Sequence, residues 1–262
     1  MGGDEYRRIS TRGKTRKSML RIGLALLAVC SFATCECSAL QATRVTSARV
    51  RLGTPACALG PLSGEEAQLL EEASGASGGT YGEITAFGFR TLMGACELGG
   101  SDVFVDLGSG GGTAVLQAAA DFGVRHAVGV ELAPSRHAFA IAEQASASED
   151  VRARTSFVEG DISDPSVAGR VLEDASVVWL SNLLFGPELM QRVATLVESA
   201  PAVRIVAVLK PIEGGLQGFT QDSLPVLCQM SWTKPSDGVH PPEPGHPCVI
   251  YRRTAAILTV SP

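Results

Sequence analysis

A glycine-rich stretch between residues 103 and 120 constrains the fold of this chain more than any other. Residues 103–107 (VFVDL) are mostly β-branched, aromatic or aliphatic and predict a buried parallel strand, and residues 113–120 predict the helix that follows it. Gly108, Gly110 and Gly112 allow the chain to turn tightly and to approach a bound molecule without a Cβ clash. The stretch therefore predicts a strand, a ligand-binding loop and a helix, although a plain structural connection remains the alternative for this stretch alone.

The glycine spacing indicates which ligand the loop takes. A dinucleotide-binding fingerprint needs its third glycine three residues after the second, and Thr113 stands there instead. The glycines alternate after Asp106, an acid at the end of the strand. This arrangement suits S-adenosylmethionine (SAM), which has no pyrophosphate and whose cationic sulfonium and amino-acid group favour a nearby acid. We therefore expect SAM as the cofactor.

The rest of the chain alternates between helical and strand patterns. Helical patterns cover residues 64–73, 84–96, 136–145 and 188–199, and strand patterns cover residues 126–131, 155–159, 175–180 and 203–210. Two further strand patterns, residues 226–232 and 249–260, have no helix between them, and the proline-rich residues 241–247 would connect them. The chain is predicted to be an α/β protein with a doubly wound, mostly parallel sheet and an antiparallel C-terminal hairpin at one edge.

Charge and hydropathy set the amino-terminal segment apart. Its 51 residues contain ten Lys/Arg and three Asp/Glu, a charge of +7, and the remaining 211 residues carry −12, which gives the formal net charge of −5. The apolar run 22–30 follows basic residues and is too short for a membrane span, as in a secretory signal, and residues 43–51 have the composition of an organelle transit segment. We expect targeting to the secretory pathway or a plastid, or a nuclear location if the segment is retained. A disordered basic tail and a true start at Met19 are the alternatives.

Three regions follow from these patterns. Residues 1–51 form the targeting or disordered segment, residues 52–100 a helical lobe with a cofactor loop, and residues 101–262 the SAM-binding catalytic domain, without a membrane span. The seven cysteines are scattered without a C-x-x-C pair, so no metal site is expected.

Polar residues stand at the carboxyl ends of four successive predicted strands. They are Asp106, Glu131, Asp161 and Asn182, and in open α/β sheets ligands bind at this edge. Glu131 is expected to accept both ribose hydroxyls of SAM, although alone it reads equally well as an exposed strand end. Asp161 either accepts the adenine amino group or caps the next helix.

Several motifs in this order make the chain similar to the disruptor-of-telomeric-silencing ("DOT-one") family, the histone lysine methyltransferases that lack a SET domain. The most specific are Tyr81-Gly-Glu83 and Asn182-x-x-Phe-Gly-Pro-Glu188, and the likeness extends to Ser231-Trp-Thr. The resemblance implies that a loop of Tyr81, Gly82, Glu83 and Ile84 covers the cofactor and that Asn182 lies beside the methyl group. It implies that SAM is held by Phe104, Asp106, Gly108, Gly110, Gly112, Thr113, Glu131 and Asp161, with Ile162 over the adenine in place of the usual aromatic residue.

The acceptor that the resemblance implies is a lysine amine. A free lysine has a pKa of about 10.4, and a narrow apolar channel favours its neutral, nucleophilic form. Asn182 is expected to orient the amine. Phe185, Trp232 and Tyr251 are candidate channel walls, with core packing as the alternative, and Tyr81 is grouped with them as a catalytic candidate.

The function that follows is a SAM-dependent protein-lysine methyltransferase with a histone or nucleosome as the implied partner. The −12 charge of residues 52–262 opposes contact with nucleosomal DNA, which predicts that the chain is not a working nuclear histone methyltransferase if its basic segment is removed. A methyltransferase of a small molecule or of a non-histone organelle protein, and a SAM-binding module without catalysis, are the alternatives.

Overall fold

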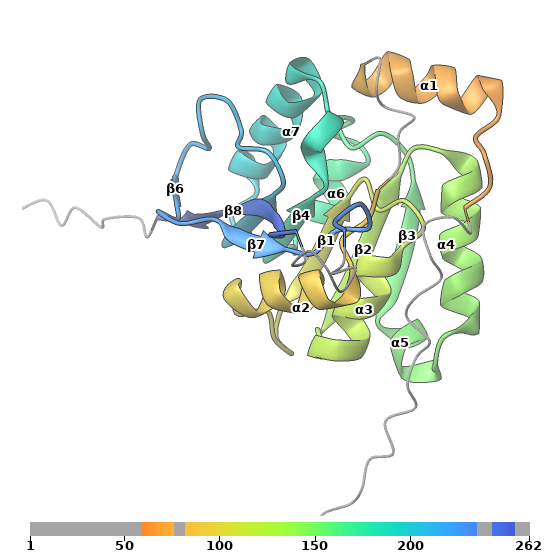
Figure 1. Ribbon diagram of the computed structural model, residues 1–262, viewed down its shortest axis with the longest axis horizontal. Coiled ribbons are helices and arrows are strands. Elements are labelled where there is room, and N and C mark those ends of the chain that lie inside the picture. The colour runs from red at the N-terminus through yellow and green to blue at the C-terminus, as the bar shows by residue number, and fades with distance from the viewer. Residues whose placement is uncertain (1–58, 76–81, 235–242, 255–262) are drawn as a thin grey trace, which may run out of the picture. The chain divides into compact units, whose positions relative to one another are not determined.

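The computed structural model describes residues 59–75, 82–234 and 243–254 (Figure 1). A sheet in the strand order β3-β2-β1-β4-β5-β8-β6 runs through it, with β7 paired to β8. The first five strands are parallel, and β6, β7 and β5 each pair antiparallel with β8. The strands are β1 (Val103–Leu107), β2 (His126–Glu131), β3 (Thr155–Glu159), β4 (Val177–Leu180), β5 (Ile205–Val208), β6 (Phe219–Gln221), β7 (Val226–Cys228) and β8 (His246–Arg253).

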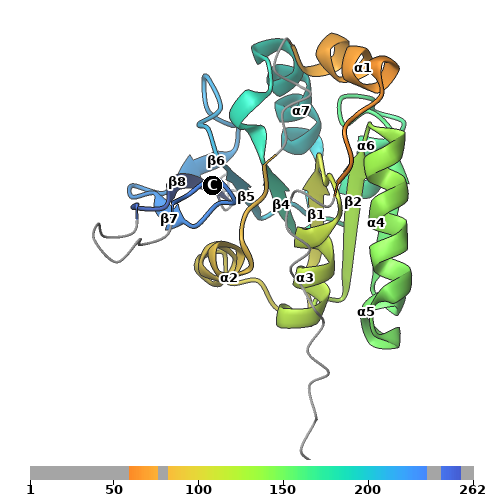
Figure 2. The same ribbon diagram turned by 45° about the vertical axis from the view of Figure 1, so that its right-hand side comes forward.

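Helices lie on both sides of the sheet, as Figures 1 and 2 show. The helices are α1 (Gly64–Ser74), α2 (Ala86–Ala95), α3 (Thr113–Phe122), α4 (Pro134–Ser146), α5 (Glu149–Ala153), α6 (Ala168–Leu172) and α7 (Pro187–Ser199), with the 3-10 turn η2 at Asn182–Leu184. Helices α2 and α3 pack on one face, and α6 and α7 pack on the other. The predicted α/β class with a mostly parallel sheet and antiparallel C-terminal strands is confirmed.

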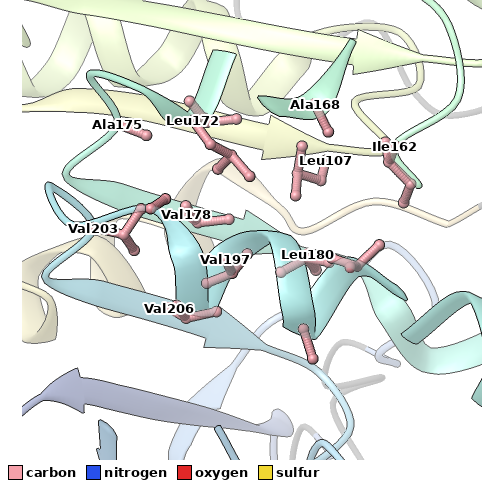
Figure 3. Close-up of a cluster of buried hydrophobic side chains, with 14 of the residues drawn as sticks. Leu107, Ile162, Ala168, Leu172, Ala175, Val178, Leu180, Val197, Val203 and Val206 are labelled. Atoms are coloured by element: carbon pink, nitrogen blue, oxygen red, sulfur yellow. The ribbon is translucent and has the colours of Figure 1, made fainter. Parts of the chain in front are cut away.

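Side chains of β1 alternate between two apolar cores. Val103, Val105 and Leu107 point toward α6 and α7, and Phe104 points toward α2, where its ring meets that of Phe89 edge-on at 5.6 Å. Figure 3 shows the first core, in which Leu107 and its neighbours fill the space between sheet and helices. Because each fully buried aliphatic or aromatic side chain contributes about 1.5–3 kcal/mol, these two cores fix the strand ends that carry the site.

The C-terminal strands differ from the expected hairpin in several respects. Strands β7 and β8 do pair antiparallel, but β8 lies inside the sheet between β5 and β6. Strand β6 was not predicted, because its three residues carry no periodic pattern. Strand β7 ends at Cys228, earlier than expected, since residues 229–231 pair instead with residues 83–85. The predicted targeting segment and residues 235–242 and 255–262 lie outside the described residues.

Asp102 joins the start of β1 to two other segments. Its carboxylate accepts hydrogen bonds from Arg204 Nη2 at 2.8 Å, Ser176 Oγ at 2.7 Å and the Gly99 N–H at 2.9 Å. Burial raises the pKa of Asp102, but the hydrogen bonds from Arg204, Ser176 and Gly99 outweigh burial and hold this pKa below its usual value. Asp102 therefore stabilises the folded state in its charged form.

Asp102→Asn is expected to lower the free energy of unfolding at pH 7 by about 1–2 kcal/mol, since Arg204 is partly exposed and solvent screens the pair. A depressed pKa stabilises the fold above the unfolded-state pKa of about 3.9 and loses this effect as the pH falls. Urea titrations at pH 7 and pH 3 should show a larger difference in the free energy of unfolding at pH 7 than at pH 3. Asp150→Asn, which removes a surface pair with Arg154, is the control and should have little effect. An equal loss at both pH values would contradict the assignment.

Candidate functional site

The loop after β1 is held by the strand beside it. The N–H groups of Gly108 and Ser109 both donate to the Val130 carbonyl at 2.9 Å. Gly108, Gly110 and Gly112 have φ values of 95°, 53° and 82°, which side-chain-bearing residues rarely adopt. A Cβ on Gly108 would lie 3.0 Å from the ring of Phe185. The loop thus needs its glycines both for its turn and for the close approach of Phe185.

Glu131 at the end of β2 organises this loop. Its Oε2 accepts the Gly110 N–H at 2.7 Å, and its Oε1 accepts the Ala133 N–H at 2.9 Å. The side chain is only 4% exposed. One carboxylate therefore fixes the turns after two adjacent strands, and each oxygen retains a lone pair for a ligand.

Two adjoining cavities lie at this edge of the sheet and share Gly82, Gly108, Gly110 and Ser181. The larger holds about 660 Å³ of empty space and is lined also by Leu70, Ala73, Ser74, Glu131, Leu132, Arg136, Asp161, Ile162, Phe185 and Leu189. The smaller holds about 330 Å³ and is lined also by Glu83, Ile84, Asp106, Ser109, Thr113, Ala114 and Trp179. Together they form one elongated site with carboxylates at several points.

Asp106 lines the smaller cavity, and its buried carboxyl group is not hydrogen-bonded in the usual way. Its Oδ1 and the neighbouring Ser109 Oγ are buried without a hydrogen-bond partner. Burial, followed by the charges of Glu131 and Glu83, raises the pKa of Asp106 well above its usual value. Buried polar atoms are normally paired, so these two atoms point to a ligand that would pair with them.

Asn182 follows Ser181, which lines both cavities, but Asn182 is itself buried, lines neither cavity, and is bound by the main chain after β5. Its Oδ1 accepts the N–H groups of Leu209 and Lys210, both at 2.9 Å, and its Nδ2 donates to the Lys210 carbonyl at 2.8 Å. The side chain therefore joins the ends of β4 and β5. Both lone pairs of its Oδ1 are used by these contacts, so this oxygen does not orient an amine as expected, and the side chain holds the backbone after β5 instead.

A strap made of residues 82–85 closes the smaller cavity and is fixed by residues 229–232. The Ser231 N–H donates to the Glu83 carbonyl at 2.7 Å, and the Glu83 N–H donates to Ser231 Oγ at 3.1 Å. Trp232 lies against the strap so closely that a Cβ on Gly82 would be 2.4 Å from its ring. Glu83 Oε1 accepts from Thr113 Oγ1 at 3.2 Å, which ties the strap to α3.

Helix α1 covers the larger cavity, which the sequence did not indicate. Its start carries a capping box of Ser63 and Glu66, and Glu66 Oε1 also accepts the Ser135 N–H at 2.7 Å. The hydrogen bonds from Ser135 and Ser63 lower the pKa of Glu66 to about 2, so it stays charged at physiological pH. At the other end, the Ser74 carbonyl accepts the Gly186 N–H at 2.9 Å. The capping box indicates a helix start in the sequence. The contact of Glu66 with Ser135 joins residues 69 positions apart, and no local pattern indicates it.

Most of the expected site residues meet at this edge, and some do not. Gly82, Glu83, Ile84, Asp106, Gly108, Gly110, Thr113, Glu131, Asp161, Ile162 and Phe185 line the cavities. Asp161 lines the larger cavity, and its Oδ1 accepts the Ser163 N–H at 2.7 Å. Tyr81 lies outside the described residues. The cavities also contain Ser109, Ser181, Arg136 and Leu189, which sequence reasoning did not assign.

Four expected placements need correction. Tyr251 is 2% exposed in the core toward α7, and its hydroxyl accepts the Ile212 N–H at 3.0 Å, so it lines no channel here. Phe104 is fully buried against α2 and does not reach the cavities. Gly112 packs against Phe157, is the N-cap residue before α3, and lines neither cavity. Trp232 supports the strap from outside and is not among the residues that line either cavity.

Within residues 59–75, 82–234 and 243–254, no group of three or more His, Cys, Asp or Glu side chains could hold a metal ion. In the same described part of the chain, no helix is both long and apolar enough to cross a membrane.

Residues 64–223 match the family model "Histone methylation protein DOT1". Two histone-lysine N-methyltransferases described as H3 lysine-79 specific are similar to the chain. The one from Caenorhabditis elegans is 32% identical over 122 residues, 44% of this chain and 13% of the relative. The one from Eremothecium gossypii is 25% identical over 147 residues, which cover 53% of this chain and 26% of the relative. The chain thus spans about a quarter or less of these relatives.

Solved structures with a similar fold have low sequence identity. An RNA methyltransferase from Salinibacter ruber, crystallised with S-adenosyl-L-homocysteine, is 21% identical with a TM-score of 0.40, over 63% of this chain and 88% of that one. The methyltransferase domain of a bacterial Hen1 protein is 11% identical with a TM-score of 0.48. The match covers 65% of this chain and 98% of that domain's chain. The family match covers more than half of the 262 residues and contains the glycine loop, Glu131, Asp161 and Asn182. This chain therefore belongs to the DOT1 histone methylation protein family.

Proposed function

We propose that the chain is a SAM-dependent methyltransferase that transfers a methyl group to a lysine amine of a protein, with a histone as the substrate class. The observation that carries this proposal is the pair of joined cavities, which combine a glycine loop clamped by Glu131 with the unpartnered Asp106 Oδ1. Family membership supports the choice of a lysine acceptor.

The residues of the two cavities fit SAM in their chemistry. In the proposed arrangement, Asp161 and Ile162 flank the adenine, and the free lone pairs of Glu131 accept the ribose hydroxyls. Asp106, Ser109 and Thr113 face the amino-acid end, where the unpartnered Oδ1 and Oγ atoms would gain donors and acceptors. When bound, SAM supplies an electrophilic methyl group on its sulfonium.

The chain's own contribution is positioning and exclusion of water. Methyl transfer to an amine requires an in-line approach, and a fixed geometry lowers its entropic cost. Phe185 and Leu189 provide apolar walls, and an apolar environment lowers the pKa of a lysine amine toward the reactive neutral form. Asn182 holds the main chain at Leu209 and Lys210, next to the proposed meeting point of the two cavities.

Calorimetry with SAM followed by transfer of a labelled methyl group to free histones and to nucleosomes tests this function. Binding together with labelling of a histone lysine is the expected result. Binding of SAM with labelling of only non-histone proteins would narrow the proposal to another protein substrate, and absence of SAM binding would overturn it.

The basic amino-terminal segment is predicted to decide how strongly nucleosomes bind. Residues 52–262 have a net charge of −12, and residues 1–51 have a net charge of +7. Affinity for DNA depends on the number of phosphates that Lys and Arg neutralise. Full-length protein should bind nucleosomes more tightly than residues 52–262, and the difference should shrink as salt rises from 50 to about 200 mM. Binding by both forms with the same salt dependence would contradict this prediction, and sequencing the amino terminus of protein from cells identifies the form that acts there.

A further inference from the structure

The Asp106 carboxyl group differs from the other acids of the site because no described residue is seen to compensate its charge. Its side chain is 3% exposed and its Oδ1 has no hydrogen-bond partner. Glu131 and Asp161, by contrast, accept hydrogen bonds from main-chain N–H groups. A buried carboxylate without such partners is very unfavourable, and the usual outcome is that the group takes up a proton.

The groups that face Asp106 from neighbouring elements have the same effect. Glu131 at the end of β2 and Glu83 in the strap both place negative charge near it. Among the described residues, the other side chains around the smaller cavity are uncharged: Ile84, Ser109, Thr113, Ala114, Trp179 and Ser181. Arg136 lines the larger cavity and is not among the residues that line the smaller one. The geometry therefore favours a neutral Asp106 while the cavity is empty.

We propose that binding of the cofactor's charged amino-acid end expels the proton of Asp106, so that cofactor affinity is linked to pH. This inference rests on the proposed function. The ligand's ammonium group keeps its own protons and pairs with the Asp106 carboxylate. The O–H bond of the carboxyl group breaks, its electron pair stays on the carboxylate, and one proton passes to solvent.

The direction of the pH dependence follows from this exchange. Below the raised pKa of Asp106 in the empty protein, each bound ligand releases up to one proton, so affinity rises by about tenfold per pH unit. Above that pKa the carboxyl group is already ionised and affinity becomes independent of pH. The same residue makes the ligand-free protein less stable as pH rises from about 4, because the unfolded chain gives up its proton at a lower pH than the folded one.

Calorimetry in pairs of buffers with different ionisation enthalpies measures the proton directly. S-adenosylhomocysteine, which has the amino-acid end, is expected to release up to one proton per bound molecule. 5′-Methylthioadenosine, which lacks that end, should release none. Equal release by the two ligands, or no release by the first at any pH between 5 and 8, would overturn the inference while leaving SAM binding intact. If neither nucleoside binds, the proposed function fails as well.

Two variants separate Asp106 from the other acids. Asp106→Asn should remove the proton release and reduce the preference for S-adenosylhomocysteine over 5′-methylthioadenosine by about tenfold or more. Glu159→Gln, a control at the exposed end of β3 on the same sheet edge, should retain the release. If Asp106→Asn binds too weakly for calorimetry, its ligand-free unfolding temperature is the second readout: it should exceed that of the parent at pH 7, with the difference vanishing near pH 4. An unchanged unfolding temperature at pH 7 would contradict the proposal.

Discussion

Glu131→Ala is expected to weaken SAM binding by about 100-fold or more. The variant removes the carboxylate that fixes the Gly110 and Ala133 N–H groups and, in the proposed complex, the acceptor for the ribose hydroxyls. Hydrogen bonds to charged groups each contribute about 1.5–3 kcal/mol, and a tenfold change in affinity corresponds to about 1.4 kcal/mol. Loss of two such bonds therefore weakens SAM binding by about 100-fold, even without any displacement of the loop.

Two control variants make this measurement specific. Glu131→Gln keeps one acceptor oxygen without charge and should fall between the parent and Glu131→Ala. Glu159→Ala removes an exposed acid that lies beside Glu131 in the register of β2 and β3, and it should leave affinity unchanged. Calorimetric affinity within threefold of the parent for Glu131→Ala would exclude the ribose site from this position.

Asn182→Ala should affect both stability and turnover. The variant leaves the N–H groups of Leu209 and Lys210 and the Lys210 carbonyl without partners in a buried setting. An unsatisfied buried group costs about 1–3 kcal/mol, and because water can reach the exposed Lys210, we expect a total loss of roughly 3 kcal/mol. The released main chain lies beside the proposed transfer point, so kcat should fall much more than SAM affinity does.

Asn182→Asp separates the hydrogen bonds that the side chain accepts from the one that it donates. It keeps the two acceptor contacts to Leu209 and Lys210 but cannot donate to the Lys210 carbonyl, so it should recover part of the stability. The assay temperature must lie below the unfolding midpoint of both variants. Unchanged urea unfolding in Asn182→Ala would contradict the clamp between β4 and β5, and normal kcat on the true acceptor would remove Asn182 from the transfer step.

The parallel part of the fold was predictable because each strand carries its signal in neighbouring residues. The run before Gly108, the alternation after it and the acids at strand ends require only local patterns, and all lie where they were expected. Phe104 shows the limit of this reasoning. It stands two residues before Asp106 on the same side of β1, and the sequence does not say at which residue the apolar core ends and the cavity begins.

The contacts that close the site could not be predicted, because they join distant segments through single hydrogen bonds. Glu66 reaches Ser135 and Gly186 reaches the Ser74 carbonyl, and neither pair forms a repeating pattern. Tyr251 was placed at the site because aromatic residues often line channels. Strand β8 instead lies next to β5 and turns that side chain toward Ile212 in the core.

The interior position of β8 also determines when the protein can become functional during its synthesis. Strands β6 and β7 have partners only in β8, which is the last strand of the described chain. Ribosomes add about 5–20 residues per second and domains fold from the amino terminus as they emerge. Until residue 253 has left the ribosome, β5 presents an unpaired edge, and residues 229–232, which follow β7, have no sheet to hold them. The strap over the cofactor site therefore forms last, and a nascent chain that stops before His246 has the glycine loop but no closed cavity.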